Sequence, residues 1–334
     1  MPSPFFAASR SDLRPLLSQP QHQQPFARFL SGRSSRPRPR IATAASPTMN
    51  TSLLLASVVV AAGAYYALHG RGSHSAQAEA PGGTPTFSRF GFHTLKLASS
   101  QDINHNVKRL RFDLGDPKKP NGLALTSSLL AITFPAGRWL PVLRPYTPLG
   151  HVDLLVKQYP GGKQSTHLHG LQAGDSVTFF RIPAYSYKPN EHSHVGVVAG
   201  GQGITPCYQL VRGILLNPED RTRVTLVWGV NADRDVMLAT ELAALQRAYP
   251  DRLTTHIVAS HPSADSQYPK GYVTGELLKS VGIVPDAASE KPSGTATGVS
   301  KVFISGPPAM EKTFGGRNGA FTQLGFTKPQ VHNF

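Results

Sequence analysis

The chain has 334 residues, of which 40% are hydrophobic and 16% charged, and its formal net charge at pH 7 is +15. These values are typical of a folded protein with about two domains. The single cysteine, Cys207, excludes an intrachain disulfide, a paired-cysteine metal site and a cysteine-ligated iron–sulfur cluster. The basic excess would attract an acidic partner. No arginine-rich helix or aromatic ladder indicates nucleic-acid binding.

The amino-terminal region has the features of a targeting sequence followed by a membrane anchor. Residues 1–48 contain seven arginines and a single acid, Asp12, which is typical of a mitochondrial leader, although a disordered basic tail has the same composition. Residues 52–68, SLLLASVVVAAGAYYAL, form a 17-residue uncharged run that predicts one transmembrane anchor. The rival interpretation is the apolar core of a secretory signal. Residues 69–88 are a Gly/Ser/Ala/Pro linker, and we expect a monomer in a mitochondrial membrane.

Residues 89–185 contain short strand-like stretches separated by Gly, Pro and Asp. Their pattern predicts a small antiparallel barrel. The stretches are HTLKLASSQ, VKRLRFDLG, SLLAITFP, VDLLVKQY and DSVTFFRIP.

Two other stretches of this half are candidate anion sites. In LRPYTPLG, strand alternation places Arg144 and Tyr146 on one face, where they could hold a phosphate and an aromatic group. In YPGGKQSTHL, two glycines precede Lys163, Ser165 and a short helix, which offers N–H groups, a cation and a hydroxyl. A salt bridge at the barrel edge and a capped turn are the alternative interpretations.

Residues 192–334 alternate between strand and helix patterns, which predicts a doubly wound parallel sheet. GVVAGGQGITP, residues 196–206, joins a strand to a helix for which we expect Thr205 as the cap and Pro206 at the first position. This glycine turn is neither a P-loop nor a regular G-x-G-x-x-G. It could bind phosphate or simply let the helix pack on the sheet. GGQGITP and SGPPAM both follow strands, where such sheets bind ligands.

Five motifs together carry a family resemblance. RPYTP, VDLLVKQY, GGKQS, AGGQGITPCYQLVRGIL and SGPPAM occur in this order. Over residues 90–334 they resemble the NADH-cytochrome b5 reductases, a family of ferredoxin-reductase-like flavoproteins. With its leader and anchor the chain is most similar to the fungal mitochondrial members. The resemblance implies a six-stranded antiparallel FAD-binding barrel followed by a doubly wound NADH-binding domain.

The resemblance also assigns the flavin contacts. Arg144 should face the flavin phosphate, Tyr146 should lie along the ring and ribityl chain, and Thr147 should bond near flavin N5. Gln164 stands where the family usually has Met, and Gly150 replaces a common Ser or Asn. The remaining flavin contacts implied in this way are Pro145, Lys157, Tyr159, Gly162, Lys163, Gln164, Ser165 and Thr205.

The nucleotide contacts follow from the same resemblance. Ser305 replaces a cysteine close to the path of hydride transfer, and Phe334 matches a carboxyl-terminal aromatic near the flavin, with a plain core contact as the alternative. Asp235 should face the adenine ribose, although Asp233 could take that place. Gln202 stands where Thr is more frequent. The other expected nucleotide-binding residues are Gly200, Gly201, Gly203, Gly306, Pro307 and Met310.

The sequence therefore predicts a membrane-anchored reductase that passes electrons from NADH through FAD to cytochrome b5. A quinone or another haem protein as acceptor is an alternative, as is a non-catalytic nucleotide-binding or assembly protein that kept the fold, which Ser305 would favour. His167 and His169 flank Leu168, but without an acid or thiol nearby in sequence they do not predict a metal site.

Overall fold

The computed structural model describes residues 85–87, 91–116, 121–150, 152–182, 185–286 and 298–334. The predicted leader and anchor, and most of the predicted linker, lie outside these residues. Among the helices that the described ranges contain, none is both long enough and apolar enough to cross a membrane.

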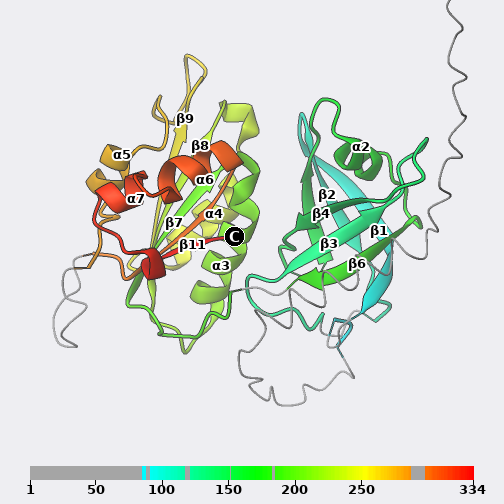
Figure 1. Ribbon diagram of the computed structural model, residues 1–334, viewed down its shortest axis with the longest axis horizontal. Helices are drawn as coiled ribbons and strands as arrows, with labels where there is room; N and C mark the ends of the chain where they lie inside the picture. Colours follow the sequence, from blue (N-terminus) through cyan, green and yellow to red (C-terminus); the bar gives the residue numbers. More distant parts are fainter. Residues whose placement is uncertain (1–84, 88–90, 117–120, 151, 183–184, 287–297) are drawn as a thin grey trace, which may run out of the picture. The chain divides into compact units, whose positions relative to one another are not determined.

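The first half of the described chain is a six-stranded antiparallel sheet with the strand order β4-β3-β6-β1-β2-β5. Figure 1 shows it curled into a barrel, with α2 beside it. The predicted antiparallel architecture is confirmed. The elements are β1 (Phe92–Asn104), β2 (Val107–Phe112), β3 (Ser128–Thr133), β4 (Val142–Tyr146), β5 (Val152–Lys157), α2 (Lys163–His169) and β6 (Ser176–Ile182).

Alternation along the strands builds the core of this half. Leu129 and Ala131 on β3 and Val177 and Phe179 on β6 are almost fully buried, because every second side chain of a strand points to the same face. Phe87 belongs to the same core and is 0% exposed, although it lies within the predicted linker, residues 69–88. The folded barrel therefore begins at residue 87 or earlier.

The second half is a five-stranded parallel sheet with the order β11-β10-β7-β8-β9, which confirms the predicted doubly wound domain. Its strands are β7 (His194–Gly200), β8 (Arg223–Val230), β9 (Leu253–Ala259), β10 (Lys301–Ser305) and β11 (Val331–Asn333). Its helices are α3 (Ile204–Leu216), α4 (Ala239–Ala248), α5 (Gly275–Ser280), α6 (Pro308–Gly315) and α7 (Ala320–Gln323), with the 3₁₀ turns η1 (Gly201–Gly203), η2 (Asp233–Asp235) and η3 (Lys328–Gln330).

Both faces of this sheet are covered by helices. Val197 and Leu226 belong to one apolar cluster with side chains of α3 and α4, whereas Val198 and Val227 belong to another with side chains of α5, α6 and α7. Strands buried on both faces read as nearly continuous apolar runs, which explains why the sequence identifies β7, β8 and β10.

The start of α3 differs from the prediction. The helix begins at Ile204, with Gly203 as its N-cap residue and no side-chain cap, because the preceding glycines tighten into η1. Thr205 is therefore inside the first turn, where its hydroxyl donates to the carbonyl oxygen of Gln202 at 3.2 Å. Pro206 is tolerated there because the first N–H groups of a helix have no partner within it.

Candidate functional site

Strand β4 carries the first group of predicted site residues. Its pairing with β3 places Arg144 opposite Ala131 and Tyr146 opposite Leu129. The Arg144 side chain is exposed, while Tyr146 packs against the barrel core, and burial raises the pKa of its phenol to about 12. Thr147 is 7% exposed and shares a hydrogen bond of 2.9 Å with the hydroxyl of Ser128. Strand β4 and the residue directly after it thus present a cation, a phenol and a fixed hydroxyl.

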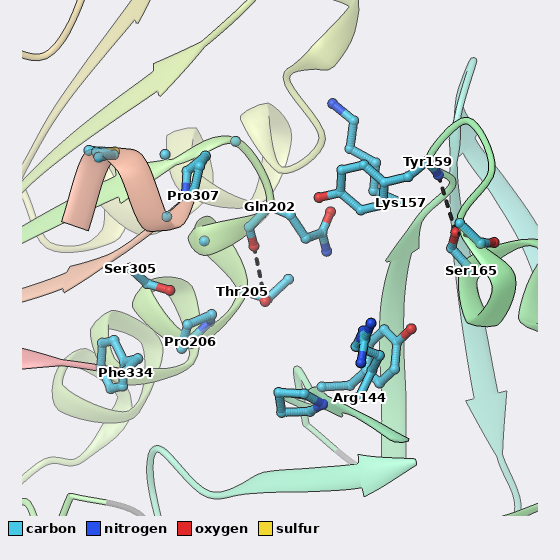
Figure 2. Close-up of a pocket in the computed structure, with 18 of the residues that line it drawn as sticks. Arg144, Lys157, Tyr159, Ser165, Gln202, Thr205, Pro206, Ser305, Pro307 and Phe334 are labelled. Atoms are coloured by element: carbon cyan, nitrogen blue, oxygen red, sulfur yellow. Dashed lines mark hydrogen bonds between the residues drawn. The ribbon is translucent and has the colours of Figure 1, made fainter. Parts of the chain in front are cut away.

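The turn between β5 and α2 is held by its own side chains. The Ser165 hydroxyl accepts from the backbone N–H of Tyr159 at 3.2 Å (Figure 2). It donates to the carbonyl oxygen of Gly162 at 3.1 Å. The Gln164 amide nitrogen donates to the carbonyl oxygen of Ala131 at 3.0 Å. Gly161 has a φ of +68°, which favours glycine. Ser165 therefore shapes this turn, and the turn presents its backbone and Lys163.

The four residues Gly200–Gly203, here called the nucleotide turn, follow strand β7. A side chain at Gly203 would overlap the carbonyl group of Ser305, and one at Gly200 would overlap the thioether of Met310. Gly201 has a φ of +50°, and no group of the described residues occupies the space where its side chain would point. Each of the two interpretations of the glycine turn therefore applies to some of its residues. Gly200 and Gly203 allow close packing, while Gly201 leaves its backbone open to a ligand.

Strand β8 leads to Asp235, which is 7% exposed. Its carboxylate forms an ion pair with Lys157 of the barrel, at 3.0 Å, and accepts from the backbone N–H of Ala232 at 3.2 Å. Asp233 instead accepts from the backbone N–H of Ser263 at 2.8 Å, and hydrogen bonds from Ser266 and Ser263 lower the pKa of its carboxyl. Of these two carboxylates, that of Asp235 is the one directed at residues that line the site.

Strand β10 and the carboxyl terminus complete the site. Ser305 ends β10, and Phe334 stacks on Phe303 with a centroid distance of 5.8 Å and an interplanar angle of 23°. The backbone N–H of Phe334 donates to the carbonyl oxygen of Ile304 at 3.1 Å, which fixes the end of the chain beside β10.

A single cavity of about 1300 Å³ is lined by every residue predicted for the site. Figure 2 shows Arg144, Lys157, Tyr159 and Ser165 on barrel elements and Gln202, Thr205, Ser305 and Pro307 on elements of the parallel domain. Sequence reasoning missed several other lining residues. Those directly after β8 and β9 could have been found from the rule that ligands bind beyond the carboxyl ends of parallel strands. The missed residues include Asn231, Ser260 and Tyr272.

The lining suits two dinucleotides. Ligand cavities commonly measure about 300–1,000 Å³, so this cavity of about 1300 Å³ has room for more than one small ligand. Arg144, Lys157 and Lys163 bring positive charge to it, and Gly161 and Gly201 leave backbone open, as phosphate groups require. The residues present therefore fit FAD and NADH.

The two histidines of the HLH motif lie elsewhere. The His169 ring nitrogen Nε2 is 2.7 Å from the carbonyl oxygen of Val156. Across the described residues, no group of three or more His, Cys, Asp or Glu side chains could hold a metal ion.

Comparison with known proteins identifies both halves. Residues 94–184 match the oxidoreductase FAD-binding domain, and residues 197–315 match the oxidoreductase NAD-binding domain. An NADH-cytochrome b5 reductase 2 from Pyricularia oryzae is 38% identical over 84% of this chain and 89% of its own length. The namesake from Emericella nidulans is 37% identical over 92% of this chain and 100% of its own length. The chain belongs to the NADH-cytochrome b5 reductase family.

A solved structure agrees with this assignment of the reductase. The cytochrome b5 reductase domain of Ulva prolifera nitrate reductase is 26% identical, with a TM-score of 0.63, over 75% of this chain and 100% of that domain. The chain is thus an oxidoreductase with an FAD-binding and an NAD-binding domain, as the resemblance of the five motifs implied.

Proposed function

We propose that this reductase passes electrons from NADH through FAD to cytochrome b5. The observation that carries the proposal is the shared cavity. The predicted flavin contacts on β4, β5 and α2 and the predicted nucleotide contacts after β7, β8 and β10 all line it. The names of the 37–38% identical relatives support cytochrome b5 as the acceptor, and the net charge of +15 would favour an acidic partner protein.

The side chains of the cavity have separate tasks in this proposal. Arg144 and Lys163 would bind the phosphates of FAD, and Tyr146, whose ring packs against the barrel core, would lie along the flavin. When bound, FAD supplies the redox chemistry that exchanges a hydride of NADH for single electrons. The nucleotide turn and Asp235 would orient NADH, and Ser305 and Phe334 would border the place where the two cofactors meet.

The location proposed is a mitochondrial membrane, with residues 52–68 as the anchor. Support comes from the uncharged 17-residue run and from the arginine-rich leader before it. Protease protection of tagged protein in fractionated organelles tests this part. A tagged protein that remains in the soluble fraction would refute it.

The function is tested with purified protein. A yellow protein that NADH bleaches without air, and that then reduces cytochrome b5, is the expected result. A colourless protein would favour a non-catalytic role. A protein that bleaches with NADH but reduces a quinone in preference to cytochrome b5 would redirect the proposal to another acceptor.

A further inference from the structure

Gln202 links the nucleotide turn to the flavin-binding barrel. Its amide nitrogen Nε2 donates to the carbonyl oxygen of Leu155 on β5 at 2.7 Å, and the residue lines the cavity. Figure 2 shows its side chain extending from the turn towards the strand that carries Lys157. A side chain of the nicotinamide site therefore bonds directly to a strand of the flavin site.

The turn that carries Gln202 is firmly fixed to its own domain. The indole N–H of Trp228, which is 0% exposed, donates to the carbonyl oxygen of Gly201 at 3.0 Å. The hydroxyl of Thr205 holds the carbonyl oxygen of Gln202 at 3.2 Å, and Gly203 packs against Ser305. A displacement of β5 is therefore resisted by the parallel domain through the Gln202 side chain.

Strand β5 is the natural target for such a contact. Leu155 is 2% exposed and packs in the apolar cluster of the parallel domain. Two residues further on, Lys157 forms its 3.0 Å ion pair with Asp235. The strand is thus held from the nucleotide side at two positions, and Tyr159, in the turn that follows the strand, lines the cavity.

Folding stability does not explain why residue 202 is a glutamine. Its oxygen Oε1 is buried without a hydrogen-bond partner among the described residues, and a buried unpaired acceptor costs folding free energy. A threonine, which the family resemblance makes the more frequent residue here, is too short to reach β5. A costly contact at the ligand cavity points to a functional constraint.

We propose that Gln202 is a positioning residue that sets the spacing between the bound nicotinamide and the flavin. The inference rests on the proposed function, because it assumes that NADH and FAD share the cavity. Misplacing reacting groups by a fraction of their contact distance slows a reaction strongly, even when both ligands still bind. Gln202 would thus act on hydride transfer through geometry, without touching the reacting atoms.

The test compares two matched glutamine variants of the full-length holoenzyme. Gln202→Met keeps the length of the side chain but removes the donor. Gln209→Met is the control, since Gln209 also bridges the halves, donating at 2.9 Å to the carbonyl oxygen of Pro148, with its own Oε1 equally unpaired among the described residues. Gln209 lies on α3, outside the cavity lining.

For each variant, FAD content, melting temperature, the stopped-flow rate of flavin reduction by NADH and the long-wavelength absorbance of the stacked nicotinamide–flavin pair are measured. We expect Gln202→Met to retain FAD and its melting temperature, to lose the stacking absorbance and to reduce flavin about tenfold more slowly. Gln209→Met should stay within about twofold of the unmodified rate, because neither Gln209 nor its acceptor Pro148 lines the cavity. Gln202→Thr serves as a second variant with the same expectation, should the methionine variant not fold.

An unchanged rate and absorbance in Gln202→Met or Gln202→Thr would overturn the inference. Equal losses in the Gln202 and Gln209 variants would also overturn it, because they would indicate a general weakening of the interface. Failure of the unmodified protein to be bleached by NADH would instead contradict the proposed function, so the two failures are distinguishable.

Discussion

Arg144 is the residue on which flavin binding should depend most. Its exposed side chain lies on β4 at the cavity, and a charge-assisted hydrogen bond to a phosphate contributes about 1.5–3 kcal/mol. We expect Arg144→Ala to bind FAD at least about tenfold more weakly, measured by titration of the apoprotein. Arg111→Ala is the control, because Arg111 bonds to Asp153 of the neighbouring strand at 2.7 Å. Unchanged FAD affinity in Arg144→Ala would remove the residue from the site.

Asp235 should determine the preference for NADH over NADPH. Its ion pair with Lys157 should affect the size of that preference. A carboxylate there accepts from a ribose 2′-hydroxyl and repels a 2′-phosphate, but the lysine at 3.0 Å weakens the repulsion. We expect NADH to exceed NADPH in kcat/KM by about tenfold or more. Asp235→Thr should narrow this ratio mainly by improving NADPH, since Lys157 would then face the 2′-phosphate alone.

The neighbouring carboxylate provides the control for this specificity experiment. Asp233 is bonded to the backbone N–H of Ser263, at 2.8 Å, and is not part of the cavity lining. Asp233→Thr should leave the ratio of the two nucleotides unchanged. Equal use of NADH and NADPH by the unmodified protein would refute the assignment, and a ratio that changes only in Asp233→Thr would transfer it to that residue.

Among the elements, the nucleotide turn should tolerate little change at Gly203. A methyl group at Gly203 would overlap backbone atoms of Ser305 and Gly306, and neither can move without displacing β10 or α6. We expect Gly203→Ala to lose about 1–3 kcal/mol of unfolding free energy, as overpacked positions do, and to bind NAD⁺ more weakly.

A glycine elsewhere in the same domain separates this packing effect from the general effect of adding a methyl group. At Gly275, the first residue of α5, the added carbon would lie 3.7 Å from the side chain of Ala320, an ordinary contact. Gly275→Ala should be neutral or slightly stabilising. Denaturant unfolding of both variants measures the difference between their unfolding free energies. Equal values would show that the turn can accommodate a methyl group at Gly203.

At the scale of the whole molecule, local pattern predicts the two sheets and the motifs but not the contacts between them. The buried strands β7 and β8 can be recognised in the sequence as apolar runs, whereas β11 has only three residues and gives no periodic signal. The pairs Lys157–Asp235 and Gln202–Leu155 join residues 78 and 47 positions apart. No spacing rule encodes such pairs. The part of the cavity formed by the parallel sheet was predictable because ligands bind beyond the carboxyl ends of its strands, whereas the bonds inside the cavity were not predictable.

The folded part of the chain should function without the predicted leader and anchor, provided that Phe87 is retained. This residue is 0% exposed in the barrel core, its backbone N–H donates to the carbonyl oxygen of Asn121 at 2.8 Å, and its ring meets that of His93 edge-on at 4.9 Å. We therefore expect a protein beginning at residue 80 to be soluble and to reduce ferricyanide with NADH. Removing a buried phenylalanine costs about 3–5 kcal/mol, a large part of the about 5–15 kcal/mol that stabilises a typical domain. Phe87→Ala in this shortened protein should accordingly melt about 10 °C lower. An insoluble or inactive shortened protein would mean that residues before 80 belong to the fold, and an unchanged melting temperature in Phe87→Ala would place the start of the barrel after residue 87.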